Sequence, residues 1–250
     1  GEDEVRRVAA VSGSVVTLDA PLKHRHAAPS GYNGLETYIA NLSRNIVLRS
    51  ENPDGVRGHV LLHAADADAT GFSNLIRFAE FCDLGRTDFT RPRNEGNPAG
   101  RYSLHFHLIG TDRDSPYSGV DGCSINRGKG WGIVQHESNA IITSNEVFDL
   151  QAGGIVSETG NENGDWSYNL VSGIHGDDIS TDHLNGIGYE SQSRVVVQYG
   201  NVATTCNRGW GFSALDPVEN SRVEGIHHKM FERDQLRFDP SPFDVAISNK

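Results

Sequence analysis

The chain has 250 residues, of which 36% are hydrophobic, and 22 Lys and Arg against 33 Asp and Glu give it a net charge of −11. No apolar run approaches the ~20 residues that span a bilayer, which argues against a transmembrane segment in this chain. The acidic balance argues against a nucleic-acid partner, because phosphate backbones require a basic face. The 28 glycines indicate many tight turns in one large folded unit.

Short β-branched runs, separated by clusters of Gly, Asn, Asp and Ser, predict strands of about 4–6 residues along the chain. Helical periodicity is almost absent. In chain order the predicted strands lie at 15–18, 45–48, 59–62, 104–108, 132–134, 140–143, 154–156 and 194–197. The sequence therefore predicts an all-β protein.

An internal repeat favours one of the possible β architectures over the others. The Gly-Ile-Val sequence at 132–134 recurs at 154–156, so 22 residues separate Ile133 from Ile155. A second echo aligns Gly188 with Gly211, which are 23 residues apart. A period in the low twenties without helices favours a parallel β-helix, a solenoid, over a leucine-rich repeat or an antiparallel jelly roll. Because the period is not strict, loop insertions are expected at 87–100, 111–119 and 174–185.

The most specific local feature is a set of histidines on one face of the predicted coil. Apolar residues and histidines alternate at 104–108, which places Leu104, Phe106 and Leu108 inward and both His105 and His107 outward. His136 and Glu158 each follow the isoleucine of the repeat by three residues, so they are expected to stack on adjacent turns. His63 follows Val60 by the same interval and extends the column.

Two chemistries use such a cluster. Neutral imidazoles of His105, His107 and His136 chelate a divalent transition metal, with Glu158 as a fourth ligand or a base. Alternatively, a His and a Glu beside a groove act as general acid and base on a sugar chain. A third interpretation treats the histidines as an ordinary solvated ladder without a ligand.

Two charged segments offer weaker candidates. Arginines around the first insertion would supply the local positive surface that an acidic sugar requires; they are Arg86, Arg91, Arg93 and Arg101. Asp177 and Asp178, in the third insertion, offer oxygen ligands of the kind that Ca²⁺ prefers. Both segments are also compatible with plain solvated loops.

Several segments together resemble an extracellular β-helix family that includes the cell-migration-inducing hyaluronidase, transmembrane protein 2 and the fibrocystin-like proteins. They are ETYIANLSRNIVL at 36–48, GHV at 58–60, GRYSLHFHLIG at 100–110, His136, ETGNEN at 158–163 and GWGF at 209–212. The resemblance covers about residues 15–215 in order. Two positions depart from the family pattern: Ser103 stands in place of a proline, and Thr159 in place of an Asp. If that Asp is needed for chemistry, this chain binds without cutting.

The resemblance implies a right-handed parallel β-helix with loop insertions at 31–225. Residues 1–30 would be the tail of a preceding glycine-rich β domain or an N-terminal cap, and residues 226–250 a C-terminal extension. The resemblance further implies an extracellular or cell-surface location within a larger protein. A hyaluronan-like polysaccharide would be the partner, with a divalent cation (Ca²⁺ or a transition metal such as Zn²⁺) and no organic cofactor.

The resulting hypothesis is an extracellular β-helix that cleaves a uronic-acid-containing polysaccharide, by hydrolysis or by a lyase route. Glu158 and His136 would act as acid and base, and Arg101 would face the uronate. His105, His107 and His136 would hold the metal, and further substrate contacts would come from Arg91, Arg93, His63, Asp177 and Asp178. The alternative is a non-catalytic glycan-binding or adhesive segment of a larger surface protein.

Overall fold

The computed structural model describes residues 2–28, 36–64, 74–111, 117–176, 185–193 and 195–212. By their internal contacts, residues 1–39 form one compact unit, and the chain from Ala40 onward forms a second. The proposed extension at 226–250 lies outside the described residues. No helix among the described residues is long and apolar enough to cross a membrane.

The first unit contains a two-stranded antiparallel hairpin. Its strands β1 (Val8–Ser12) and β2 (Val15–Leu18) pair across a short turn that contains Gly13. Gly13 has φ +59°, a left-handed conformation that glycine adopts without steric cost. The predicted strand at 15–18 is confirmed.

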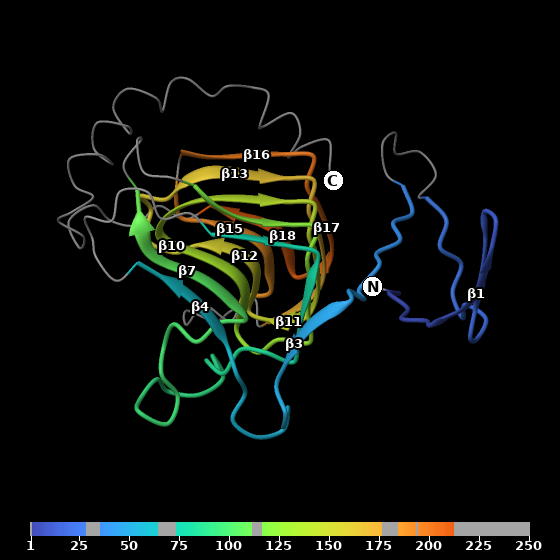
Figure 1. Cartoon of the computed structure of the whole chain (residues 1–250), viewed down its shortest axis with the longest axis horizontal. Coiled ribbons are helices and arrows are strands. Elements are labelled where there is room, and N and C mark those ends of the chain that lie inside the picture. Colours follow the sequence, from blue (N-terminus) through green and yellow to red (C-terminus); the bar gives the residue numbers. More distant parts are fainter. Residues whose placement is uncertain are drawn as a thin grey trace. The chain divides into compact units, whose positions relative to one another are not determined.

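The second unit is built from three ladders of parallel strands (Figure 1). The first ladder contains, in spatial order, β3 (Ile46–Arg49), β6 (Ala79–Cys82), β9 (Ser124–Asn126), β11 (Glu146–Gln151), β14 (Leu170–His175) and β17 (Val202–Cys206). The second contains β4 (Val60–His63), β7 (Leu104–Gly110), β10 (Trp131–Thr143), β12 (Gly153–Ser157), β15 (Ile187–Ser191) and β18 (Arg208–Phe212). The third contains β5 (Leu75–Arg77), β8 (Ser118–Asp121), the second half of β10, β13 (Asn163–Ser167) and β16 (Val195–Tyr199).

The chain visits the three ladders in a fixed cyclic order, first, second, third and then first again. Each strand therefore pairs with the equivalent strand of the preceding and following turn of chain. All these pairings are parallel, which is opposite to the antiparallel pairing that a jelly roll requires.

The 22-residue repeat is confirmed, because Ile133 pairs with Ile155. The second echo is wrong by two residues, since Tyr189 pairs with Trp210 and not with Phe212. The rings of Tyr189 and Trp210 stack at 5.2 Å between centroids, and this inward packing sets the register. Gly188 and Gly211, on which the predicted alignment was based, have no side chain that could determine the register.

The main core lies between the ladders and consists of the inward side chains of successive turns. It includes Phe81, Leu104, Phe106, Ile125, Ile133, Ile142, Val147, Ile155, Trp166, Val171 and Tyr189. A second, smaller cluster is formed by Phe89, Tyr102, Trp131, Val134, Ala152 and Val156. Because Val134 and Val156 alternate with the inward Ile133 and Ile155, this second cluster lies on the outer face of the second ladder. The segment around Phe89 and Tyr102 therefore covers part of that face.

Left-handed residues bend the chain between the second and third ladders. Leu108 has φ +54° and Glu137 has φ +43°. The expected inward position of Leu108 is wrong: Leu108 is half-buried, and Ile109 enters the core instead. For the same reason the strands predicted at 132–134 and 140–143 are two halves of one bent strand, β10.

Stacked asparagines form the corner between the third and first ladders. The Asn169 Oδ1 accepts the backbone N–H of Asn145 at 3.0 Å, and the Asn201 Oδ1 accepts that of Asn169 at 3.0 Å. All three side chains are buried. The asparagine side chains thus provide hydrogen-bond partners for backbone N–H groups that have no strand partner at the corner.

Candidate functional site

The strand register stacks polar side chains in a column on the outer face of the second ladder. His63 of β4 pairs with His107 of β7, which pairs with His136 of β10. Glu158 directly follows β12, and its backbone N–H donates to the Gln135 carbonyl at 2.9 Å. Glu158 therefore occupies the next turn of chain after His136, as the repeat predicts.

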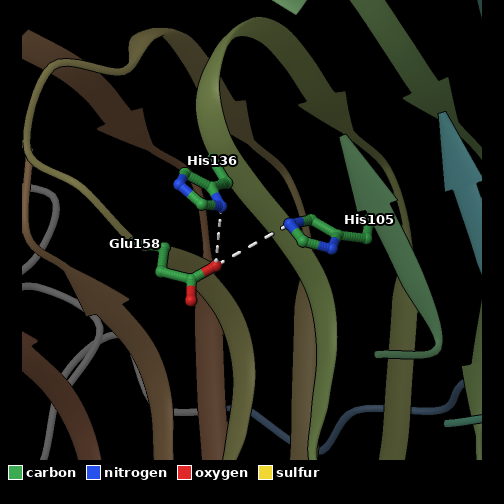
Figure 2. Close-up of side chains that lie close together, drawn as sticks. All are labelled: His105, His136 and Glu158. Atoms are coloured by element: carbon green, nitrogen blue, oxygen red, sulfur yellow. Dashed lines mark ion pairs between the residues drawn. The ribbon is translucent and has the colours of Figure 1, made fainter. Parts of the chain in front are cut away.

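Three side chains from neighbouring turns converge at this column. Figure 2 shows His105 and His136 directed at the same carboxylate oxygen of Glu158. The Glu158 Oε2 lies 3.7 Å from the His105 Nε2 and 3.4 Å from the His136 Nδ1. Among the described residues, one ligand atom from each of these three side chains lies within 4.8 Å of the others. Two imidazole nitrogens and one carboxylate oxygen form a ligand set for a divalent transition metal.

His105 is the most buried member of the cluster, with 1% of its surface exposed. Its Nδ1 lies 3.0 Å from the Gly100 carbonyl oxygen, which can only accept a hydrogen bond. Nδ1 therefore carries the proton, and Nε2 presents its lone pair to Glu158. No hydrogen bond reaches this Nε2 from the described residues. Burial lowers the pKa of His105 to about 3, so the imidazole is neutral and able to bind a metal.

Glu158 has one oxygen engaged and one free of hydrogen bonds. Its Oε1 accepts a hydrogen bond of 3.2 Å from the Tyr102 hydroxyl. Its Oε2 is buried and receives no hydrogen bond from the described residues. Burial raises the pKa of Glu158 to about 7, even though the Tyr102 hydroxyl opposes this change. A buried carboxylate oxygen without a donor is costly, and a bound cation or a proton would remove that cost.

The loop that carries Glu158 is fixed by a second carboxylate. Glu162 is fully buried and accepts the backbone N–H groups of Thr159 at 2.6 Å and Gly160 at 2.7 Å. It also accepts the N–H of Glu137 at 3.4 Å, which ties the loop to the bend in β10. The Thr-Gly-Asn-Glu spacing at 159–162 is typical of a carboxylate that binds preceding N–H groups, and this signal could have identified Glu162 from the sequence.

His107 lies beside the other two predicted metal ligands, with its ring centroid 5.0 Å from that of His105, but it is not in the group of converging ligand atoms. His63 Nδ1 lies 3.1 Å from the His107 carbonyl oxygen and 3.0 Å from the His107 Nδ1. The His107 ring packs edge-on against the His136 ring, at 4.7 Å between centroids. Burial lowers the pKa of His107 to about 4. Among the described residues, the group of converging ligand atoms therefore contains His105, His136 and Glu158, and the His107 ring packs beside it.

Of the predicted arginines, Arg93 and Arg101 carry charges that act on Glu158 and His105, and neither guanidinium has a hydrogen bond to the cluster among the described residues. The Arg101 guanidinium bonds to the Ala99 carbonyl at 3.5 Å, and its charge adds to the effect of burial in lowering the pKa of His105. Arg91 and Arg93 line a hollow of about 340 Å³ beside Phe89. The Arg93 guanidinium carbon lies 5.2 Å from the centre of the Phe89 ring. Asp177 and Asp178 lie outside the described residues.

Replacing Glu158 with glutamine is expected to change how the stability of the metal-free chain depends on pH. The pKa rises from 4.5 to about 7 on folding, so the native state holds this proton more tightly than the unfolded state. The associated stability is present below pH 4.5 and is lost as the pH rises through 7. Between pH 4.5 and 8 the native chain should lose up to about 3 kcal/mol relative to Glu158→Gln.

Urea unfolding of both proteins in a metal chelator, at intervals from pH 4.5 to 8, measures this difference directly. Histidines that do not contact Glu158 titrate alike in both proteins, so their contribution cancels in the comparison. A stability difference that is constant with pH would contradict the raised pKa of Glu158.

The fold and site define an all-β, parallel-stranded protein with a histidine–carboxylate cluster on one sheet face. Comparison with known proteins identifies several relatives of this chain. The chain is 29% identical to a G8 domain-containing protein of Dictyostelium discoideum over 92% of this chain and 21% of the relative. A second such protein from that organism is 29% identical over 70% of this chain and 11% of the relative. Mouse fibrocystin-L is 26% identical over 68% of this chain and 5% of the relative.

The chain is therefore a homologue of G8 domain-containing proteins and of fibrocystin-L, and spans about a fifth or less of the length of these relatives. No family model matches it, and no solved structure gives a significant match. These relatives support the fibrocystin-like part of the expected resemblance. They do not single out the hyaluronidase or transmembrane protein 2.

Proposed function

We propose that this chain is a non-catalytic, glycan-binding segment of a larger extracellular protein, organised around a divalent metal site on its outer face. The observation that carries the proposal is the convergence of His105 Nε2, His136 Nδ1 and Glu158 Oε2. Two of these atoms are buried without a hydrogen bond from the described residues. The partial coverage of much longer relatives supports a place within a larger protein.

We further propose that the three ladders form a right-handed parallel β-helix. Its support is the cyclic order in which the chain visits the three ladders, with one strand added to each ladder per turn. Such a stack buries each turn against the next and leaves the outer faces free for binding. The His63–His107–His136–Glu158 column would then run along the axis of the helix.

The donor set favours Zn²⁺ or a similar transition metal over Ca²⁺. Ca²⁺ takes six to eight oxygen ligands, whereas two imidazoles and one carboxylate match a zinc site with three protein ligands. Such a site keeps a fourth position for an external group, and a bound metal would polarise that group. The chain itself would hold the metal and orient the ligand beside it.

A polyanionic glycan fits the surroundings of this site. Arg91 and Arg93 bring positive charge to a chain whose net charge is −11, and they line a hollow next to the Phe89 ring. The positive charge of Arg93 also opposes the rise that burial causes in the pKa of Glu158, which is consistent with Arg93 being near the cluster. Guanidinium groups match carboxylates in a two-point geometry.

Glycan binding is tested with immobilised chain and soluble hyaluronan, with a neutral polysaccharide as a control. We expect saturable binding of hyaluronan, weakened about tenfold or more by Arg91→Ala with Arg93→Ala and by chelator, without shortening of the polymer. Arg77→Ala is the matched control, because Arg77 is an exposed arginine paired with Asp121 in the third ladder. Absence of binding, or binding unaffected by the double substitution, would reject this part of the proposal.

Cleavage is the second candidate, and the raised pKa of Glu158 favours it. A protonated Glu158 would give its proton to the leaving glycosidic oxygen while His136 takes one from the attacking water, so that water is added across the bond. Arg101 would face the uronate. New reducing ends that disappear in Glu158→Gln would establish cleavage in place of simple binding. An unsaturated uronate at the new non-reducing ends would then indicate the lyase route, and saturated ends would indicate hydrolysis.

A further inference from the structure

We propose that Tyr102 is a positioning residue of the metal site, whose hydroxyl fixes the Glu158 carboxyl so that Oε2 faces the two imidazoles. This inference rests on the proposed metal-binding function and adds what orients its ligands. Metal sites depend on such outer partners, because a ligand that is already oriented loses less freedom when the metal binds.

The contact between Tyr102 and Glu158 gives the two carboxyl oxygens different roles: one binds the Tyr102 hydroxyl, and the other faces the histidines. The hydroxyl donates to Oε1 at 3.2 Å, which leaves Oε2 directed at the histidines. Tyr102 is 1% exposed, and burial raises its pKa well above the ordinary value, so the hydroxyl stays protonated and acts as a donor. A rotated carboxyl would break this bond.

Tyr102 is itself held from several sides. Its ring lies 4.9 Å from the Trp131 ring and 5.0 Å from the His105 ring, measured between centroids. It also lies parallel to the Phe89 ring at 6.2 Å. The same side chain therefore packs against one proposed ligand, His105, and hydrogen-bonds to another, Glu158.

The backbone beside Tyr102 fixes the remaining geometry. The Gly100 carbonyl accepts the His105 Nδ1 proton, and the Arg101 N–H donates to the Thr87 hydroxyl at 2.9 Å. The Thr87 hydroxyl in turn donates to the Pro98 carbonyl at 2.8 Å, which closes the insertion on itself. Residues 100–102 thus connect the insertion at 87–100 to two of the three proposed ligands, and this insertion orients the site.

The test compares Tyr102→Phe with Tyr189→Phe in the 250-residue chain. Tyr102→Phe retains the ring and removes the donor to Glu158. Tyr189→Phe removes another buried hydroxyl, which donates to the Asn169 carbonyl at 2.8 Å and does not contact the cluster. Zn²⁺ affinity is measured by competition with a chromophoric chelator, and ligand geometry by the visible absorption of the Co²⁺-loaded chain. Thermal unfolding of the metal-free proteins reports structural damage separately.

We expect Tyr102→Phe to weaken Zn²⁺ binding about 10–100-fold and to alter the Co²⁺ spectrum. We expect Tyr189→Phe to lower the unfolding temperature and leave affinity and spectrum unchanged. A Tyr102→Phe protein with native affinity and spectrum would overturn the positioning role, as would equal losses in both variants. A native chain that binds no Zn²⁺ would instead overturn the proposed metal-binding function.

Discussion

Replacing His105 with alanine should abolish stable zinc binding, with a loss of affinity of at least about 100-fold. His105 supplies a neutral imidazole whose Nε2 is aimed at the Glu158 carboxylate and has no hydrogen bond from the described residues. Without it, one nitrogen and one oxygen remain, which is too few to hold a transition metal against chelation. Elemental mass spectrometry of chain purified without an affinity tag measures the metal, and calorimetric titration measures the affinity.

Two other histidines serve as controls for this result. His175→Ala should have no effect, because His175 is exposed and pairs with Asp149 outside the cluster. His107→Ala should have a smaller effect than His105→Ala, since His107 packs against His105 and His136 but is not in the group of converging ligand atoms. An equal loss in His107→Ala would restore the three-histidine ligand set expected from the sequence. Metal retained in His105→Ala would contradict the site.

Replacing Gly164 with alanine should destabilise the fold by about 2–4 kcal/mol. Gly164 has φ +142°, and an added Cβ would lie 1.8 Å from the carbonyl oxygen of Ala140. These two residues pair directly between β13 and β10, so the clash falls on the backbone of two adjacent turns of chain. Denaturant unfolding at pH 7 measures the loss.

Gly209→Ala is the matched control for this second prediction. Gly209 lies in β18, and its added Cβ would meet only the Ala203 Cβ at an ordinary 3.5 Å. Its substitution should change stability by less than about 1 kcal/mol. If the two variants are equally stable, the register between β10 and β13 in the third ladder is wrong.

The sequence predicted the parts of the fold in which apolar residues repeat. Ile133 and Ile155 carry the 22-residue period because both pack inward at the same place on adjacent turns. Strands such as β9 (Ser124–Asn126) and β13 (Asn163–Ser167) were missed, since their residues are mostly polar or glycine. They are strands because neighbouring turns offer them partners, and no local propensity shows this.

The parts of the site that depend only on strand register were predicted from the sequence. The parts that depend on contacts between distant segments were missed. The stacking of His63, His136 and Glu158 follows from counting residues after the inward apolar position. The burial of His105 does not, because it depends on a cover that contains Phe89 and Tyr102. Local alternation says which way a side chain points, and it does not say what lies above it.

Tyr102 illustrates the same limit more sharply. It belongs to the GRYSLHFHLIG segment, yet nothing in that segment indicates a bond to Glu158, 56 residues later. Such a contact appears only when the register of three turns and the path of the insertion are both known. Outer partners of a site are therefore harder to find from one sequence than its ligands are.

X-ray absorption at the zinc edge of the zinc-loaded chain identifies the atoms that bind the metal. We expect a first shell of nitrogen and oxygen at about 2.0–2.1 Å, outer scattering from two imidazoles, and loss of one imidazole contribution in His136→Ala. A shell containing sulfur at about 2.3 Å, or one of oxygen alone without imidazole scattering, would contradict a site built from His105, His136 and Glu158.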